Sequence, residues 1–343
     1  MRRYLRGGYA VWPPNCDGVH PRQAIGKSHH RGRPLGQGEA HPSVEGTTGK
    51  ASTSARDLAT PAGTRAILRQ FGIRPSKRWG QHFLVSAQAL NRTLAAAALD
   101  PADSVLEVGA GMGTLTAGLA ERAGWVTAVE VDRGLLEALH TTVGGRPNVR
   151  IIPGDVLAMP PAALFDGPPD APRKVVANLP YNIASAVLMR LLEAPLGITL
   201  LVVTVQREVA ERIAARPGGR DYGILSVATQ YHATPRILAR IPAGAFLPRP
   251  KVASSLVELK PHRTPAASVP DERAFFRVVT AGFGQRRKML SNALAAGLDL
   301  PRAVVERACA EAGVDPRARA ETLGLAAFAS LARALHPHLR PLP

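Results

Sequence analysis

The chain of 343 residues carries 43 Lys and Arg side chains against 26 Asp and Glu side chains, and its formal net charge is +17. This excess favours a polyanionic partner, because neutralising phosphates gives an affinity that does not depend on nucleotide sequence. Two cysteines cannot build a disulfide framework, and no apolar run is long enough to cross a bilayer. We therefore expect neither a disulfide-rich secreted protein nor a membrane span, but a protein of a reducing, cytoplasmic compartment.

Residues 1–60 are rich in Gly and Pro and have almost no apolar periodicity, so we expect a disordered N-terminal extension. The segment is Arg-rich like an organelle transit peptide, but it lacks the amphipathic face of one. A bacterial start assigned too far upstream is the simpler explanation. Its His29-His30 pair has no Cys or His partners at zinc spacing, so no metal site is expected.

From about residue 61, short apolar runs alternate with helical patterns. The runs that predict strands are 105–108, 126–129, 149–152, 175–177 and 199–205. Strands that alternate with helices indicate an α/β fold with a doubly wound, mostly parallel sheet of the Rossmann-like kind. Two later runs, 236–241 and 254–259, would close the sheet edge as a hairpin. We expect this domain to cover residues 61–260.

The first of these strands runs into closely spaced glycines that include Gly109 and Gly111. Such glycines let the backbone approach a cofactor and turn into a helix, and Glu130 follows about 20 residues later, where it can hold a ribose diol. The spacing is G-x-G-x-G and an acid, Glu107, precedes it. This pattern favours S-adenosylmethionine over a dinucleotide, with a tight turn that binds nothing as the alternative.

The third strand leads into Asp155 and Val156, which places a carboxylate at the same edge of the sheet. Ligands of open α/β sheets bind outside the carboxyl ends of the strands. Asp155 is therefore a candidate for the adenine amine of the cofactor, although Gly-Asp also occurs in ordinary turns.

The fourth strand ends in Asn178-Leu179-Pro180-Tyr181. The lone pair of adenine N6 is delocalised into the ring, and acceptors aimed at its two N–H bonds localise it for attack. Asn178 Oδ1 and the Leu179 carbonyl would be those acceptors, Pro180 would stiffen the turn, and Tyr181 would stack on the base. An amine held in line with a sulfonium methyl then needs mainly positioning. The motif predicts an adenine N6-methyltransferase, against the alternative of a plain Asn-x-Pro turn.

Beyond a linker at 261–270, helical patterns at 272–294, 301–312 and 325–335 predict a small all-α domain over residues 270–340. The densest basic cluster, Arg286-Arg287-Lys288, falls in the first of these helices. It is placed to grip an RNA backbone, and the alternative is a solvated charged face.

Taken together, these stretches resemble the small-subunit (16S) ribosomal RNA adenine-N6,N6-dimethyltransferase family. The further blocks that carry the resemblance are 77–84, 205–210, 222–227, 246–252 and 283–290. The resemblance covers residues 65 to 335 and holds several motifs in one order, which makes it more specific than any one of them.

The resemblance implies transfer of methyl groups from S-adenosylmethionine to N6 of two adjacent adenosines near the 3′ end of 16S ribosomal RNA. The target adenine would be flipped out and held between Tyr181 and Phe246. The expected cofactor pocket consists of Gln81, His82, Leu84, Gly109, Gly111, Glu130, Asp155, Val156 and Asn178. The expected RNA contacts are Arg78, Arg249, Lys251, Arg286, Arg287 and Lys288. The expected partner is the small ribosomal subunit, and we expect a monomer.

Two departures from the family pattern lie in the late loop, where Arg249 stands in place of a common proline and Ala253 in place of an acid. The alternatives are a large-subunit (23S) methyltransferase of the macrolide-resistance type, a DNA adenine methyltransferase, and a ribosome-assembly or transcription factor without catalysis. Leu179 and the block 222–226 favour the small-subunit family. The presence of Glu130, Asp155 and Asn178 favours an active enzyme.

Overall fold

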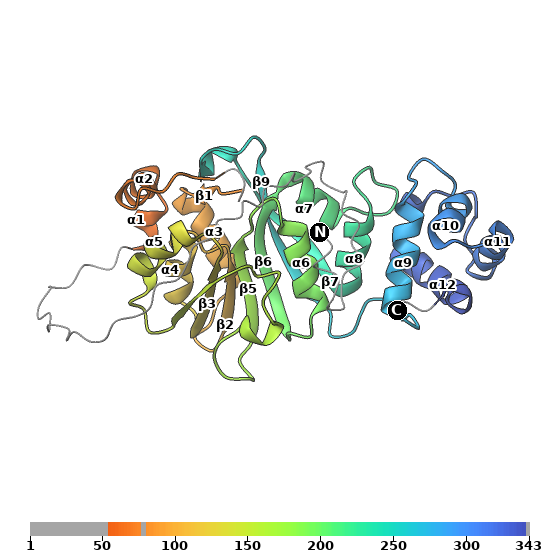
Figure 1. The fold of residues 1–343 in the computed structure, drawn as a ribbon, viewed down its shortest axis with the longest axis horizontal. Coiled ribbons are helices and arrows are strands. Elements are labelled where there is room, and N and C mark those ends of the chain that lie inside the picture. Colours follow the sequence, from red (N-terminus) through yellow and green to blue (C-terminus); the bar gives the residue numbers. More distant parts are fainter. Residues whose placement is uncertain (1–53, 77–79, 341–343) are drawn as a thin grey trace, which may run out of the picture. The chain divides into compact units, whose positions relative to one another are not determined.

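The computed structural model describes residues 54–76 and 80–340 (Figure 1). Most of the expected N-terminal extension, with Cys16 and the His29-His30 pair, lies outside these residues, and so does Arg78. The described part begins with helix α1 (Ala55–Leu58), in which Ala55 and Leu58 are buried. Helical structure is therefore present before residue 61, within the expected extension.

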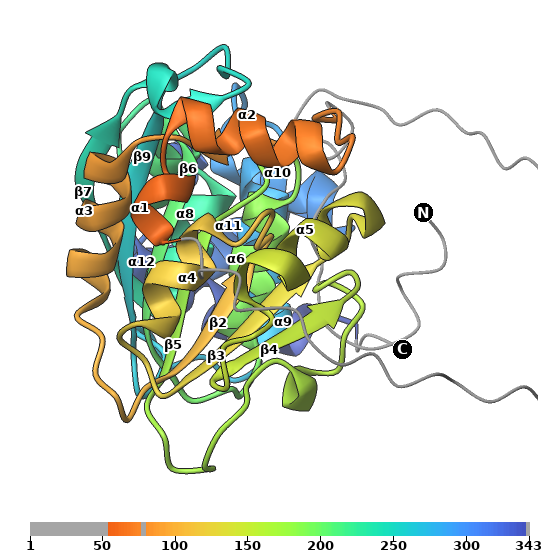
Figure 2. The same cartoon turned by 90° about the vertical axis from the view of Figure 1, so that its left-hand side faces the viewer.

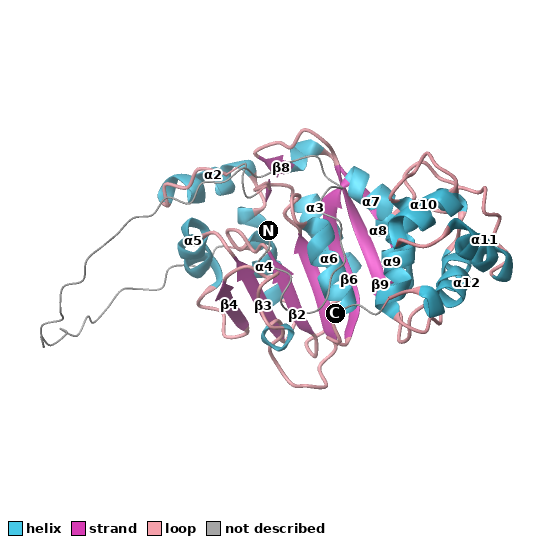
Figure 3. Cartoon of the chain, turned by 45° about the vertical axis from the view of Figure 1, so that its right-hand side comes forward, coloured by secondary structure: helices cyan, strands magenta, loops and turns pink. Residues whose placement is uncertain are grey.

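A seven-stranded sheet forms the centre of the α/β part, in the order β4-β3-β2-β5-β6-β9-β7 (Figure 3). Its strands are β2 (Ser104–Val108), β3 (Trp125–Glu130), β4 (Val149–Pro153), β5 (Arg173–Asn178), β6 (Ile198–Gln206), β7 (Ala233–Ile241) and β9 (Ser254–Pro261). The first five in this order are parallel, and β9 pairs antiparallel with both β6 and β7. The doubly wound sheet and its closing hairpin, both predicted from the sequence, are confirmed.

The direction of winding changes at β2, which pairs with β3 on one side and β5 on the other. In sheets of this kind the crevice beyond the carboxyl ends of the strands at such a point receives the ligand. The glycine turn after β2 and the Asn178 turn after β5 therefore lie at one edge of the sheet.

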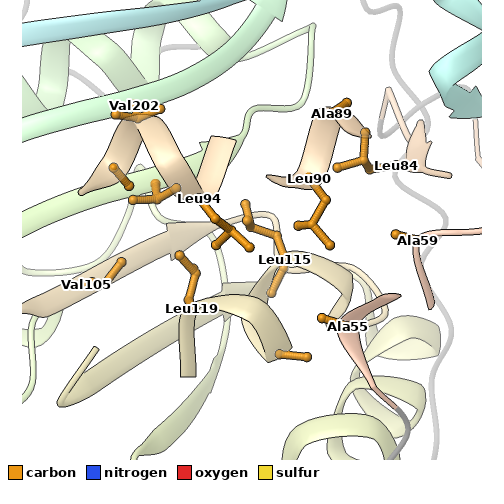
Figure 4. Close-up of a cluster of buried hydrophobic side chains, with 14 of the residues drawn as sticks. Ala55, Ala59, Leu84, Ala89, Leu90, Leu94, Val105, Leu115, Leu119 and Val202 are labelled. Atoms are coloured by element: carbon orange, nitrogen blue, oxygen red, sulfur yellow. The ribbon is translucent and has the colours of Figure 1, made fainter. Parts of the chain in front are cut away.

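Helices follow the strands: α2 (Pro61–Gln70), α3 (Ala87–Ala97), α4 (Thr114–Ala120), α5 (Arg133–Val143), α6 (Ala184–Glu193), α7 (Arg207–Ala214) and α8 (Ile224–His232). Helices α1, α3 and α4 pack together on the sheet (Figure 2). Their apolar side chains, among them Leu90, Leu94 and Leu115, form a buried cluster with Val105 and Val202 of the strands (Figure 4). Burial of this cluster holds the helices to the sheet.

Four helices form the C-terminal part: α9 (Glu272–Phe283), α10 (Leu290–Leu298), α11 (Arg302–Glu311) and α12 (Leu325–Leu335). The prediction of one helix over 272–294 is wrong, because α9 ends at Phe283 and α10 begins at Leu290. The basic cluster therefore lies in a turn and not in a helix. Gly284 caps α9 in a right-handed conformation, and the three cations that follow lie near the negative end of that helix, where positive charge is stabilising.

A second, two-stranded sheet pairs β1 (Phe83–Leu84) with β8 (Phe246–Leu247) in antiparallel register. It ties the segment before α3 to the loop between β7 and β9. Short 3-10 helices lie at η2 (Pro161–Ala163), η3 (Ala243–Ala245), η4 (Ala320–Thr322) and η5 (His336–His338). Within the described residues, no helix is both long and apolar enough to cross a membrane.

Candidate active site

A pocket lies at the carboxyl ends of β2, β3 and β5, and the segment that contains β1 forms one of its walls. Every residue that the sequence predicted for a cofactor pocket lines it: Gln81, His82, Leu84, Gly109, Gly111, Glu130, Asp155, Val156 and Asn178. Leu179, Pro180 and Tyr181 line the same pocket. The structure thus brings the residues that the sequence predicted for the cofactor and those that it predicted for the amine into one pocket.

The turn after β2 depends on glycine. Gly109 and Gly111 have φ of 73° and 60°, a region that side chains other than glycine rarely occupy. A Cβ on Gly109 would also lie 3.2 Å from the ring carbons of Pro180. The absence of this Cβ therefore lets the Asn178 turn pack directly against the glycine turn.

Glu130 ends β3 with its carboxylate buried and turned back toward the glycine turn. The Gly111 N–H donates to Oε2 at 2.8 Å, and the N–H groups of Val131 and Asp132 donate to Oε1 at 2.9 Å. Burial raises the pKa of Glu130, and these three donors oppose the rise by stabilising the charged form. Each carboxylate oxygen can accept more than one hydrogen bond, so Glu130 can still accept from a diol.

Glu107 is a site residue for which the sequence analysis assigned no role. It is 2% exposed, lines the pocket, and its Oε2 has no hydrogen-bond partner among the described residues. Burial raises its pKa to about 8, and the neighbouring Glu130 carboxylate adds to the rise. The signal in the sequence was an acid inside an otherwise apolar strand, which is costly unless it has a task.

Asn178 has its side-chain amide fixed by a backbone group. Its Nδ2 donates to the main-chain carbonyl of His82 at 3.0 Å, while Oδ1 is buried without a hydrogen-bond partner. Because a carbonyl can only accept, the amide must present Nδ2 to His82 and is left with Oδ1 as a free acceptor. Leu179 continues the turn, and its N–H donates to the Thr204 carbonyl of β6 at 3.1 Å.

Tyr181 lines the pocket half-buried, and Phe246 does not line it. The Phe246 side chain is 2% exposed and packs in the hydrophobic cluster that contains Leu84 and Ala245. The ring beside Tyr181 is instead that of His82, at a centroid distance of 5.0 Å and an interplanar angle of 30°. The structure therefore does not place Tyr181 and Phe246 on two sides of one space.

Gln81 and Asp155 have polar atoms that already bond within the chain. Gln81 accepts from the Ser76 N–H at 2.7 Å and donates to the Asp132 carboxylate at 2.5 Å, so its amide connects the pocket wall to the start of α5. Asp155 Oδ1 accepts from the Leu157 N–H at 2.9 Å. Both residues border the pocket. Both polar atoms of the Gln81 amide are bonded within the chain, whereas Asp155 keeps its second carboxylate oxygen, Oδ2, without a hydrogen bond to the described residues.

The side chains predicted to contact RNA differ in whether they already make hydrogen bonds within the chain. Arg249, Lys251, Arg287 and Lys288 are exposed. Arg286 is exposed as well, but its guanidinium donates to the carbonyls of Arg220 at 3.0 Å and Tyr222 at 3.2 Å. Arg286 therefore already binds two backbone carbonyls, whereas the side chains of Arg287 and Lys288 make no such contact.

The residues of the pocket fit S-adenosylmethionine. A buried carboxylate with spare acceptor capacity suits a ribose diol, and the unpartnered Oε2 of Glu107 suits a positively charged ligand group. The glycine turn after β2 lines the pocket with its backbone. Among the described residues, no group of three or more His, Cys, Asp and Glu side chains is arranged to hold a metal ion.

Comparison with protein families gives a match over most of the chain. The model of the family described as ribosomal RNA adenine dimethylase matches residues 73–336. A relative from Moorella thermoacetica named ribosomal RNA small subunit methyltransferase A is 46% identical over 284 residues, which are 81% of this chain and 98% of the relative. A relative of the same name from Pelotomaculum thermopropionicum is 46% identical over 80% of this chain and 96% of its own length.

Two solved structures have similar folds. The 23S rRNA methyltransferase ErmE has a TM-score of 0.56 and 29% identity, and the match covers 74% of this chain and 99% of that one. A dimethyladenosine transferase from Plasmodium falciparum has a TM-score of 0.60 and 22% identity, over 75% of this chain and 98% of that one. From the extent of the family match and the identity to the curated relatives, the chain belongs to the ribosomal RNA adenine dimethylase family.

Proposed function

We propose that this protein transfers methyl groups from S-adenosylmethionine to N6 of two adjacent adenosines near the 3′ end of small-subunit ribosomal RNA. The product is N6,N6-dimethyladenosine, and the reaction belongs to ribosome biogenesis in the cytoplasm. The relatives that are 46% identical carry the name of a small-subunit methyltransferase, which supports this substrate over the large subunit. The observation that carries the chemistry is Asn178, a residue of the pocket lining whose Oδ1 is buried and has no hydrogen-bond partner among the described residues.

Asn178 and Leu179 act on the amine. One N–H of Asn178 Nδ2 donates to the His82 carbonyl, while Oδ1 has no partner among the described residues, so Oδ1 would accept a hydrogen bond from a donor such as an amine. An N–H bonded to Oδ1 and a second N–H bonded to the Leu179 carbonyl would turn the N6 lone pair out of conjugation. The cofactor supplies an electrophilic methyl group when it is bound, and the protein contributes mainly alignment.

The second methylation places a demand on the same two acceptors. A monomethylated amine has one N–H left, so one of the two acceptors must face a methyl group. The turn at Pro180 and the half-buried Tyr181 would border that methyl. The pocket must therefore accept a larger amine without losing the alignment that Asn178 provides.

Tyr181 carries the stacking on the flipped base in this proposal. Stacking of a base on an aromatic ring contributes about 1 to 3 kcal/mol and suits a nucleotide taken out of its helix. Phe246 lies in a hydrophobic cluster and would have to leave it to reach the base. We therefore assign the base contact to Tyr181 alone in the conformation described here.

Four exposed basic side chains among the predicted RNA contacts make no side-chain hydrogen bond or ion pair within the described residues, and these would hold the RNA. These are Arg249 and Lys251 in the loop between β8 and β9, and Arg287 and Lys288 in the turn between α9 and α10. The helices over residues 270–340 would thus form an RNA-binding domain beside a catalytic domain over residues 61–260. The partner is the small ribosomal subunit, bound by one copy of the protein.

The deciding experiment is transfer of labelled methyl groups to small subunits that lack the modification, with large subunits tested in parallel. We expect dimethyladenosine in the small subunit alone, identified as the nucleoside by mass spectrometry. Label in the large subunit would indicate the resistance-type reaction instead. RNA binding without transfer to either subunit would indicate an assembly factor.

A further inference from the structure

The hydroxyl group of Tyr181 is held by a side chain for which no role has been assigned. Tyr181 Oη and Ser254 Oγ are 2.6 Å apart and share a hydrogen bond. Ser254 is fully buried and begins β9. In the sheet it lies opposite Gln206 of β6 and Ile241 of β7, so its backbone has neighbours on both sides. A hydroxyl on such a strand is a rigid anchor for the tyrosine.

The ring of Tyr181 has a second contact, with His82. His82 Nδ1 lies 2.7 Å from the Pro248 carbonyl, and since a carbonyl can only accept, Nδ1 must carry the proton. The imidazole is therefore fixed in orientation, 5.0 Å from the Tyr181 ring. Pro248 and Ser254 flank the loop of residues 249–253. Ser254 bonds directly to Tyr181, and Pro248 acts on it indirectly by binding His82, whose ring contacts the Tyr181 ring.

Tyr181 needs such support because stacking has little directional preference of its own. A ring that rotates about its side-chain bonds would let a stacked base rotate with it, and the amine would then miss Asn178 Oδ1. Burial raises the pKa of the Tyr181 hydroxyl, which keeps it neutral. Its hydrogen bond to Ser254 therefore serves position and not proton transfer.

We propose that Ser254 is a positioning residue, which fixes the plane of the Tyr181 ring so that a base stacked on it presents its amine to Asn178. This inference rests on the proposed function. It assigns the loop that follows Phe246 a role in holding Tyr181, while Phe246 itself stays in the hydrophobic cluster.

The test is a double-mutant cycle with Ser254→Ala, Tyr181→Phe and both together. Each single change removes the same hydrogen bond from one side. We expect each to lower kcat on small subunits by about 3- to 10-fold, the range for one hydrogen bond, with KM for the subunit nearly unchanged. The double variant should be no slower than the slower single variant, because the bond can be lost only once. Monomethyladenosine should accumulate in all three, since the second transfer tolerates misalignment least.

Ser255→Ala is the matched control, because Ser255 is the next residue of β9, is 1% exposed, and has its side chain on the other face of the strand. It should keep both kcat and the product ratio. Binding of S-adenosylmethionine, measured by calorimetry, should be equal in all variants and shows that the pocket is intact. Tyr181→Phe leaves β9 unchanged, so it still tests the proposal if Ser254→Ala does not fold.

Two results would overturn the inference. In one, the losses of the single variants multiply in the double variant, and in the other Ser254→Ala behaves like Ser255→Ala. If the wild-type protein transfers no methyl group to small subunits, the proposed function fails first and the inference falls with it. Transfer by the wild type with no coupling between the two positions overturns the inference alone.

Discussion

The Asn178 side-chain amide donates to the His82 main-chain carbonyl at 3.0 Å, although the two residues are 96 positions apart in the chain. This bond fixes the orientation of the amide, because the carbonyl can only accept and Nδ2 must point toward it. It also joins the segment before α3 to the proposed catalytic turn, because His82 binds Asn178 through its backbone carbonyl and contacts Tyr181 through its ring. The geometry of the amine site is therefore shared between two distant segments.

Replacing Asn178 tests the acceptor directly. Asn178→Ala removes Oδ1, and we expect kcat to fall about 100-fold, as for other preorganised hydrogen-bonding groups that act on a reacting centre. Asn178→Asp should also be slow, because a carboxylate cannot donate to the His82 carbonyl and would be repelled by it. Single-turnover methyl transfer measures both. An Asn178→Asp variant with wild-type kcat would contradict the orientation that we derive from His82.

Glu130 should control cofactor affinity more than turnover. Glu130→Ala removes the acceptor for a diol, and it also leaves the N–H groups of Gly111, Val131 and Asp132 without their partner. We expect the Kd for S-adenosylmethionine, measured by calorimetry, to rise roughly 10- to 100-fold from the loss of charged hydrogen bonds. Glu137→Ala, on the exposed face of α5, is the control and should bind normally. Equal Kd values for the two variants would show that Glu130 does not bind the cofactor.

The sequence predicted the parts of the fold that local pattern determines. The parallel strands β2, β3, β4 and β5 contain mostly apolar runs, and the side chains at their carboxyl ends share one edge because parallel strands align those ends. Gly109, Glu130, Asp155 and Asn178 were found in this way, whereas Gln81, His82 and Leu84 were expected only from the family resemblance. Pairing of β1 with β8 could not be predicted, because each strand has two residues and no pattern joins segments so far apart.

The environments of individual side chains could not be predicted from the sequence either. The sequence does not distinguish an aromatic residue that stacks on a base from one that packs in a hydrophobic core. Only the structure shows that Phe246 is 2% exposed. Likewise three adjacent cations gave no sign that Arg286 binds the carbonyls of Arg220 and Tyr222. Such distinctions depend on long-range contacts and not on residue type.

Tyr181 and Phe246 should respond to truncation in opposite ways. Phe246→Ala leaves a cavity in a buried cluster and should lower the free energy of unfolding by about 3 to 5 kcal/mol. Tyr181→Ala should strongly lower the rate of methyl transfer and change the free energy of unfolding little, because the Tyr181 ring is only half-buried and lines the pocket. Denaturant unfolding and transfer assays on both variants measure the difference. Normal stability of Phe246→Ala combined with loss of transfer would place Phe246 on the base instead.

Glu107 should make both stability and cofactor binding depend on pH. Its pKa is raised from an ordinary 4.5 to about 8 in the folded protein. Between these values the folded state holds a proton that the unfolded state has lost, so the contribution of Glu107 to stability falls as pH rises from about 4.5 to about 8. Glu107→Gln removes the ionisation, so its unfolding free energy should fall less than that of the wild type over this window.

The same group predicts proton release on cofactor binding. At pH 7 Glu107 is protonated in the free protein, and a cationic ligand in the pocket favours its ionised form. Calorimetry in two buffers of different ionisation enthalpy should therefore give different binding heats for the wild type and equal heats for Glu107→Gln. Equal heats for the wild type as well would mean that Glu107 stays protonated when the cofactor binds.

The turn between α9 and α10 should show which basic residues contact RNA. Arg287 and Lys288 are exposed and make no side-chain hydrogen bond or ion pair within the described residues, whereas Arg286 holds two carbonyls that precede α8. Changing Arg287 and Lys288 together to Ser should weaken binding to small subunits and reduce the slope of log affinity against log salt by about 1.5 to 2, the loss of two phosphate contacts. Arg286→Ala should instead lower the melting temperature and change the slope little. If the double variant keeps the wild-type slope, the turn is a solvated face, and the RNA is held by Arg249, Lys251 or other basic residues.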